Sequence, residues 1–170
     1  MKAQQHLFAR YAQQLPPATL CWIGLRPQHR AAMVSVDSCQ AIKDLGLAGD
    51  HRSTKTPGSG RQVTIISQEF IQQIALHSNK PDLQPEQLRR NLVVSGINLN
   101  ALRHQQFSLG SAIFEATALC HPCSRMEQPL GKGGVAAMLG YGGLCCKVLK
   151  SGEIKLGDQL KVLATQAELF

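Results

Sequence analysis

The chain has 170 residues, a net charge of +7 and 44% hydrophobic residues, which together indicate one folded domain that can bury its own core. Only 17% of the residues are charged, and glycine and proline are near their average abundance, so disordered, collagen-like and low-complexity proteins are excluded. Because only 5% of the residues are aromatic and the positive charge is scattered, we expect no nucleic-acid partner.

The sequence predicts an accessory helix over residues 1–17 and a single domain over residues 18–165. Leu7, Tyr11 and Leu15 recur every four residues, and the two prolines that follow would end the helix. Short runs rich in Val, Ile and Thr, each bounded by Gly, Pro or Asp, then predict strands. These runs cover residues 19–25, 31–38, 61–67 and 91–97.

Two helices are expected in the middle of the chain. Ser67 can cap a helix over residues 68–78, and Pro85 suits the first turn of a short helix over residues 85–90. Strands are predicted again over residues 107–110, 112–120, 144–150 and 153–164. The intervening residues 43–60 and 124–143 are expected to be long loops, a length that is often functional. The pattern is typical of a mostly β barrel or sandwich with a few helices.

No run of about 20 apolar residues occurs, so we expect neither a membrane-spanning segment nor a membrane partner, and a cytoplasmic location. The six cysteines are then expected to be thiols, because a chain of this length in a reducing compartment does not need disulfides.

The sharpest local motif is CHPCSR at residues 120–125. A structural zinc site would need two further ligands, and no second Cys-x-x-Cys or paired histidine motif occurs. A thioredoxin-like pair would open a helix, but no helical pattern follows the motif. The third interpretation is one reactive or metal-ligating thiolate at Cys123, favoured by positive charge on His121 and Arg125, with Cys120 in the core. Two structural cysteines remain the alternative.

Arginines near the ends of predicted strands form a second candidate site. Arg61 follows Gly58-Ser59-Gly60, Arg89 and Arg90 precede another strand, and Arg26 follows the first strand. A guanidinium group binds a compact oxyanion such as phosphate through two parallel hydrogen bonds. Solvated arginines at strand ends would give the same pattern. No G-x-S-x-G, P-loop or G-x-G-x-x-G motif supports a serine hydrolase, an NTPase or a dinucleotide-binding protein.

Taken in order, six segments between Trp22 and Val162 resemble the MOSC domain family, found at the C-terminus of molybdenum-cofactor sulfurases and in small stand-alone bacterial proteins. The segments are WIGLRP at 22–27, GLAGD at 46–50, GRQVTII at 60–66, LRRNLVVSGINL at 88–99, CHPCSRME at 120–127, and GGLCCKVL with GEIKLGD within 142–158. The resemblance implies a mostly β fold with a few short helices, built as a MOSC-type, pyruvate-kinase-barrel-like antiparallel β-barrel.

The resemblance also implies roles for individual residues. The family's central cysteine falls on Cys123, which would either carry sulfur as a persulfide or ligate molybdenum held by the dithiolene of a pterin cofactor. The cofactor-binding residues implied are Arg26, Asp50, His51, Arg61, Gln62, Arg89, Arg90, Asn91, His121 and Arg125. Many family members have Arg-His after Gly-Asp, whereas this chain has His51-Arg52, so a role for His51 that depends on that order is not implied.

Two functions follow from the resemblance. The first is reduction of a small N-hydroxylated compound by a Cys-ligated molybdenum cofactor. Its electrons would come from a separate donor protein, because the chain has no flavin or nicotinamide motif. The second is a sulfur carrier that receives sulfur from a donor and holds it as a persulfide on Cys123 for assembly of the molybdenum cofactor or a metal-sulfur cluster.

Overall fold

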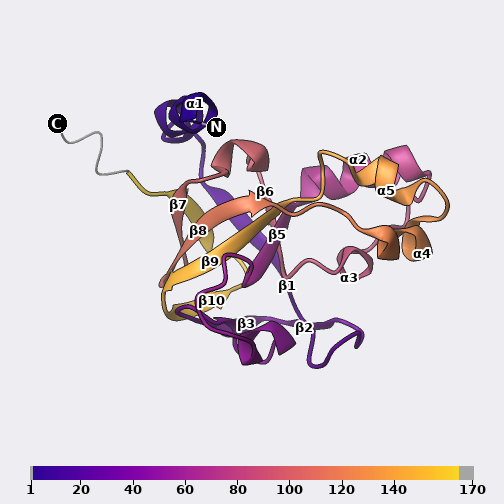
Figure 1. Cartoon of the computed structure of the whole chain (residues 1–170), viewed down its shortest axis with the longest axis horizontal. Coiled ribbons are helices and arrows are strands. Elements are labelled where there is room, and N and C mark those ends of the chain that lie inside the picture. The colour runs from indigo at the N-terminus through magenta and orange to yellow at the C-terminus, as the bar shows by residue number, and fades with distance from the viewer. Residues whose placement is uncertain (1, 165–170) are drawn as a thin grey trace.

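A closed barrel of seven strands forms the centre of the protein in the computed structural model, which describes residues 2–164 (Figure 1). The strands lie in the order β11-β7-β8-β9-β5-β6-β1, and pairing of β1 with β11 closes the ring. Their bounds are Ala18–Leu25 for β1, Val63–Ser67 for β5, Leu92–Ser95 for β6, Gln106–Leu109 for β7, Ala112–Leu119 for β8, Leu144–Lys150 for β9 and Gln159–Val162 for β11.

The expected barrel is confirmed, and its strands pair antiparallel except for β5 and β6, which run parallel. Parallel neighbours need a long crossover connection. Here α2 (Gln68–Ser78) and α3 (Pro85–Leu88) supply it. The Ser67 hydroxyl accepts a hydrogen bond from the Phe70 N–H at 3.1 Å, and Pro85 opens α3, so both predicted helix starts are confirmed.

The barrel interior is filled by the inward-facing apolar residues of its strands. The rings of Phe107 and Phe114 stack with centroids 5.4 Å apart, and Leu20, Ile65 and Val148 are fully buried with them. Each such side chain contributes about 1.5–3 kcal/mol by its removal from water. The interior is therefore a packed core, and it leaves the outer face and the ends of the barrel for function.

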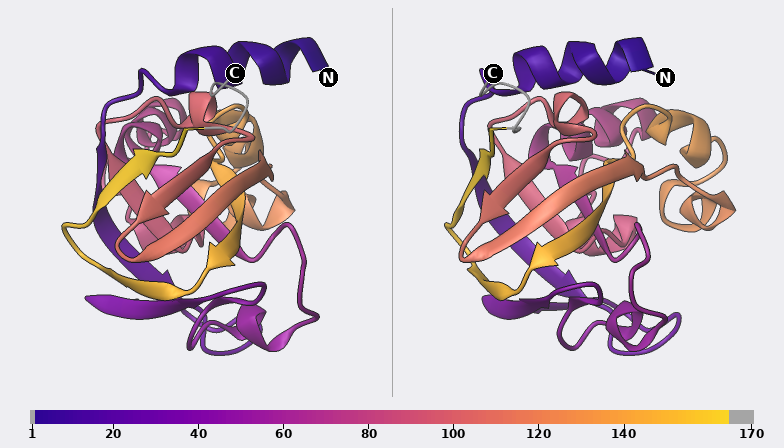
Figure 2. Two further views of the ribbon diagram at one scale, coloured as in Figure 1. Left: turned by 90° about the vertical axis from the view of Figure 1, so that its left-hand side faces the viewer. Right: turned by 60° about the vertical axis from the view of Figure 1, so that its left-hand side comes forward.

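Smaller elements cover the two ends of the barrel (Figure 2). The helix α1 (Lys2–Ala12) lies across one end and stops four residues before the two prolines. At the other end, β10 (Gly152–Lys155), β3 (Ser38–Ile42) and β4 (Gly46–Leu47) form a three-stranded sheet, followed by the 3-10 turn η1 (His51–Thr54). The strand β2 (Val34–Val36) extends the barrel sheet beside β1, and a second 3-10 turn, η2 (Leu99–Leu102), precedes β7.

The prediction of a long loop over residues 124–143 is wrong, because this segment contains three short helical turns. They are η3 (Ser124–Met126), α4 (Glu127–Leu130) and α5 (Gly134–Met138), and Figure 1 shows α4 and α5 beside α2. Met126, Leu130 and Met138 are buried there. Turns of three to five residues are too short to show a helical period, so only their tertiary packing defines them. The other long segment, residues 43–60, holds β4 and η1.

Candidate functional site

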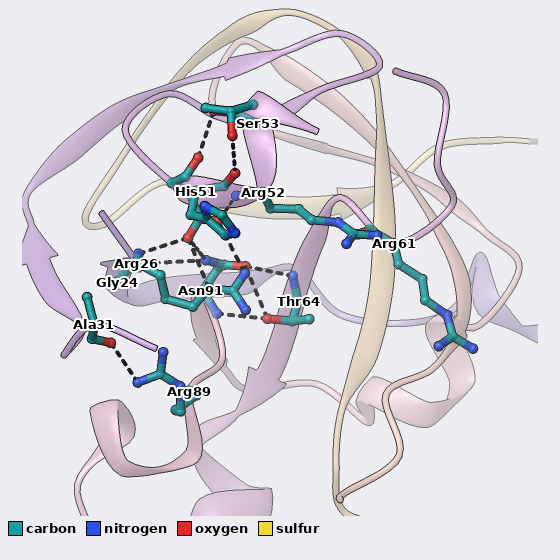
Figure 3. Close-up of polar contacts among 12 residues, drawn as sticks. Gly24, Arg26, Ala31, His51, Arg52, Ser53, Arg61, Thr64, Arg89 and Asn91 are labelled. Atoms are coloured by element: carbon teal, nitrogen blue, oxygen red, sulfur yellow. Dashed lines mark hydrogen bonds and ion pairs between the residues drawn. The ribbon is translucent and has the colours of Figure 1, made fainter. Parts of the chain in front are cut away.

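A buried hydrogen-bonded cluster of Arg26, Asp50 and Asn91 lies where β1, β5 and β6 meet η1 (Figure 3). The Asp50 carboxylate, 2% exposed, accepts hydrogen bonds from the backbone N–H groups of Arg26 and Arg52, both at 2.9 Å. It also forms an ion pair with the Arg26 guanidinium at 3.2 Å. Burial opposes ionisation of Asp50, but the hydrogen bonds and charge of Arg26 outweigh it and lower the pKa of the carboxyl group.

Asn91 connects this cluster to the barrel. Its amide nitrogen donates to Asp50 Oδ2 at 2.9 Å and to the Gly24 carbonyl at 3.1 Å. Its amide oxygen accepts hydrogen bonds from Arg26 Nη2 and from the backbone N–H and hydroxyl of Thr64. Both ends of this side chain are thus occupied by the protein. Asn91 and Asp50 position Arg26 and η1 and are not free to bind a ligand themselves.

A pocket of about 300 Å³ opens beside the cluster, and we call it the basic pocket. It is lined by Arg26, Gln28, His29, Arg30, His51, Arg52, Lys55, Arg89 and Arg125. Six of these residues are Arg or Lys, and none is Asp or Glu. The ion pairs among residues 3–164 are Arg26–Asp50 and Lys147–Asp44, so five of the six cations have no carboxylate partner there. The pocket therefore carries an uncompensated positive charge that suits an anion.

The positive charge of the basic pocket acts on one of its two histidines, His29, by lowering the pKa of that side chain. The rings of His29 and His51 lie with centroids 5.7 Å apart. Partial desolvation and the positive charges of Arg30 and Arg125 lower the pKa of His29. An anion in the pocket would reverse part of this effect, because it favours the protonated imidazole.

Two arginines of the basic pocket have left-handed backbone conformations. The φ angles are 62° at Arg30 and 57° at Arg89. Arg89 ends α3, and its Nη1 donates to the Ala31 carbonyl at 2.8 Å, which ties the loop after β1 to the helix end. Such a conformation costs a residue with a side chain about 1–2 kcal/mol. This conformation persists only where the surrounding structure holds it, and at Arg89 the hydrogen bond to Ala31 does so.

A larger hollow of about 630 Å³ adjoins the basic pocket. The two share three lining residues, Arg30, Arg89 and Arg125. The remaining lining residues of this adjoining hollow are Glu86, Gln87, Met126, Gln128 and Pro129. Beyond the shared arginines, its lining combines amide groups, apolar groups and the carboxylate of Glu86, whereas six of the nine residues that line the basic pocket are Arg or Lys. The pair of hollows can hold a molecule with an anionic end and a larger part of mixed polar and apolar character.

The cysteines of the CHPC motif have different environments. Cys123 is exposed, directly before η3 and two residues before Arg125 of the basic pocket. Cys120 is half-buried after β8 and is not part of the hydrophobic core, so the expectation that it lies in the core is wrong. The neighbouring Cys145 thiol, together with the charges of Arg90 and Arg61, lowers the pKa of Cys120 although burial opposes this.

Comparison with known protein families matches residues 51–161 to the MOSC domain. The chain belongs to the MOSC domain family. YuaD of Bacillus subtilis, whose name connects it with metal-sulfur cluster biosynthesis, is 31% identical to it over an alignment of 127 residues, and the match covers 64% of this chain and 64% of YuaD. The crystal structure of YuaD superposes with a TM-score of 0.75 at 22% identity, covering 89% of this MOSC chain and 98% of YuaD. YiiM from Geobacillus stearothermophilus gives a TM-score of 0.68 at 14% identity, covering 86% of this chain and 75% of YiiM. These superpositions show the shared fold.

The basic pocket of this MOSC domain gathers four of the cofactor-binding residues predicted from the sequence, namely Arg26, His51, Arg89 and Arg125. Asp50 and Asn91 lie behind them as the supporting cluster. His121 is exposed on the segment that leads to Cys123.

Cys123, His121 and the supporting residues Asp50 and Asn91 do not themselves line either hollow, and neither do three other predicted residues. Arg90 is buried and donates to the carbonyls of Gly142, Leu88 and Cys120 at 2.7, 3.0 and 3.3 Å. Gln62 is buried between the Ser59 carbonyl and the Val148 N–H. The Arg61 carbonyl accepts a hydrogen bond from Arg52, while its own guanidinium extends away from Arg26 and Asn91 in Figure 3. In this MOSC domain these residues shape the strands around the site.

Sequence reasoning missed His29, Arg30, Arg52 and Lys55 as pocket residues. Two local signals could have found them, since residues 26–30 read RPQHR and residues 51–55 read HRSTK. Both segments are dense in basic residues, and each contains one of the predicted site residues, Arg26 in the first and His51 in the second. What the sequence did not show is that the two segments face one another across a single pocket.

The described residues of this MOSC domain can be compared with what a zinc site or a thioredoxin-like pair would need. Within residues 2–164, no group of three or more His, Cys, Asp or Glu side chains could hold a metal ion by itself. No turn or helix spans residues 120–123, and η3 begins only after Cys123. Across the same described residues, no helix is both long and apolar enough to cross a membrane.

Proposed function

We propose that this MOSC protein binds a molybdenum cofactor through the phosphate of its pterin and through Cys123, and that it reduces small N-hydroxylated compounds such as hydroxylamines or amidoximes. The observation that carries the proposal is the basic pocket. Five cations that have no carboxylate partner in the described part of the chain surround a space of about 300 Å³, and such an environment suits a phosphate dianion.

The two adjoining hollows fit the two parts of such a cofactor. Arg30, Arg89 and Arg125 border both, so they would hold the phosphate where the hollows meet. Gln87 and Gln128 offer amide donors and acceptors for the polar edge of a heterocycle, and Met126 offers apolar surface for its face. When bound, the cofactor would supply two-electron redox chemistry by oxygen-atom transfer.

The chain's own residues would bind the cofactor and hold it in a fixed orientation. Cys123 would supply a soft thiolate ligand, which suits molybdenum. Its exposure and its position two residues before Arg125 support this role, because both belong to the segment that reaches the pocket. Asp50 would hold Arg26 and η1 in place through its ion pair and backbone hydrogen bonds. A separate protein would donate electrons, because the sequence carries no flavin or nicotinamide motif.

The second candidate is a sulfur carrier. The name of the relative YuaD connects that protein with metal-sulfur cluster biosynthesis, and Cys123 here is exposed to a sulfur donor. In this role Cys123 would hold the transferred sulfur as a persulfide and pass it to a cofactor or cluster under assembly. The cations of the basic pocket would then bind the phosphate of the acceptor.

Metal and pterin analysis distinguishes the two candidates. The protein would be purified from a host that makes molybdenum cofactor, together with Cys123→Ala and with Cys21→Ala as an exposed-thiol control on β1. Stoichiometric molybdenum that is lost in Cys123→Ala and kept in Cys21→Ala supports the reductase. A metal-free protein with cyanide-labile sulfur on Cys123 supports the carrier. Protein with neither molybdenum nor labile sulfur contradicts both.

A further inference from the structure

A second thiol site lies where the ends of β8 and β9 pair. Ala118 pairs with Cys145 and Leu119 with Leu144, and the backbone N–H of Cys120 donates to the Gly143 carbonyl at 2.8 Å. In antiparallel strands this register places Cys120 on the same face of the sheet as Cys145, as its diagonal neighbour. Two cysteines distant in sequence are therefore brought together by strand pairing.

The face that carries this pair is the outer face of the barrel. Cys146, next in the chain, is fully buried in the core and pairs with Ala116, so Cys145 points the opposite way. A register shift in β8 leaves Ala116 paired with Cys146 and Ala118 paired with Cys145, so the paired residues of the two strands still share a face. Thr64 of β5 pairs with Cys145 on its other side. The thiol pair is thus one strand away from the Thr64–Asn91 hydrogen bonds of the site cluster.

Small neighbours leave room for the two thiols to meet. Gly143, opposite Cys120, has no side chain, and a Cβ there would collide with the Ile65 carbonyl. Ala118, opposite Cys145, has only a methyl group. The two thiols lie close enough for each to shift the pKa of the other, that of Cys120 downward and that of Cys145 upward. The register therefore makes the pair neighbours in the folded protein, with no bulky side chain directly opposite either thiol.

The two thiols differ in access and in charge. Cys120 is half-buried and Cys145 is 4% exposed, so a small reagent reaches Cys120 first. The neighbouring Cys145 thiol and the nearby arginines lower the pKa of Cys120, while the neighbouring Cys120 and burial raise the pKa of Cys145. Cys120 is thus both the more accessible and the more readily ionised thiol, which makes it the nucleophile of the pair.

We propose that Cys120 and Cys145 form a reversible, hydroperoxide-sensitive thiol pair that is separate from the chemistry of Cys123. The Cys120 thiolate attacks the terminal oxygen of a hydroperoxide. The S–O bond forms, the O–O bond breaks, and the leaving oxygen takes up a proton and departs as water or an alcohol. Cys120 becomes a sulfenic acid, oxidised by two electrons. Cys145 then attacks this sulfur, the S–S bond forms, and the hydroxyl group leaves as water with the Cys145 proton. An external dithiol reductant restores both thiols.

Peroxide oxidation of the reduced full chain tests the proposal. The remaining thiols are blocked with N-ethylmaleimide and the peptides analysed by mass spectrometry. The expected result is a Cys120–Cys145 linkage that a dithiol reductant removes, and that forms equally in Cys123→Ser. In Cys145→Ala, a sulfenic acid accumulates on Cys120 and is trapped by dimedone. In Cys120→Ser, Cys145 stays reduced.

Cys39 supplies a comparison within the same molecule. It is also half-buried, but burial raises its pKa to about 11. At pH 7, Cys120 should react with N-ethylmaleimide at least about tenfold faster than Cys39, since the thiolate is the reacting form. A linkage from Cys120 to Cys123, loss of the linkage in Cys123→Ser, or equal reactivity of Cys120 and Cys39 in the unmodified protein would each overturn the proposal. The last comparison needs no substitution, so it does not depend on how a variant folds.

Discussion

Replacement of Arg89 by glycine separates ligand binding from stability at the basic pocket. Arg89 has a φ of 57°, and its guanidinium donates to the Ala31 carbonyl at 2.8 Å. Glycine relieves about 1–2 kcal/mol of left-handed strain. Against this, it loses about 0.5–1 kcal/mol through the greater freedom of the unfolded chain and about 0.5–1.5 kcal/mol through the missing hydrogen bond. These contributions nearly cancel, so the free energy of unfolding should change by less than about 1 kcal/mol.

Anion binding should respond quite differently to Arg89→Gly. A charge-assisted hydrogen bond contributes about 1.5–3 kcal/mol, so affinity for an inorganic anion such as pyrophosphate should fall about 10- to 150-fold. Isothermal titration calorimetry gives the affinity, and urea unfolding gives the stability. Asn79→Gly is the matched control, because Asn79 also ends a helix with a φ of 53° but lies outside both hollows. Unchanged pyrophosphate affinity in a stable Arg89→Gly protein would refute the role assigned to Arg89.

Three further predictions concern other parts of the site. Asp50→Asn should cost about 3 kcal/mol of unfolding free energy at pH 7, because it leaves Arg26 without its buried partner. Folding lowers the pKa of Asp50, so the stability that its carboxylate contributes is present at pH values above the unfolded pKa and is lost as pH falls through the folded pKa. Urea unfolding at several pH values should show this loss of stability at low pH in the parent protein but not in the variant. Sulfate affinity, measured by calorimetry, should rise as pH falls through the lowered pKa of His29, which gains a positive charge while sulfate keeps its own charge, and His29→Gln should flatten this dependence; the same pH profile in the variant would contradict it. Gly143→Ala should lower the free energy of unfolding by about 2 kcal/mol or more, because the residue has a φ of 86° and its Cβ would collide with Ile65; an unchanged thermal midpoint would count against this packing.

Much of the secondary structure could be predicted because its signals are local. Ser67 caps α2 through its own hydroxyl, and Pro85 opens α3 through its fixed φ, so neighbouring residues alone decide these starts. The turns within residues 124–143 could not be predicted in the same way. They have no repeating pattern, and they exist because Met126, Leu130 and Met138 find a buried surface beside α2.

The candidate site was predictable only in part. The residues with chemical potential could be selected from their types and neighbours, and Arg26, His51, Arg89 and Arg125 do line one pocket. Their selection could not distinguish an arginine that faces a ligand from one that holds backbone carbonyls, as Arg90 does. Arg89 and Arg90 are neighbours in the chain, but their side chains point in different directions. Only Arg89 adopts the left-handed backbone conformation, at the end of α3.

By itself, the sequence determined the apolar strand runs, the helix starts and the ordered segments that identify the MOSC fold, since each depends on residues close together in the chain. The tertiary structure decided which charges meet. Packing of the loops and turns beside the strand ends brings residues 26, 28–30, 51, 52, 55, 89 and 125 around one pocket, and the register of β8 against β9 places Cys120 beside Cys145. Charge density and thiol contact depend on distances across strands, and those distances are set by pairing between segments that the local sequence does not connect.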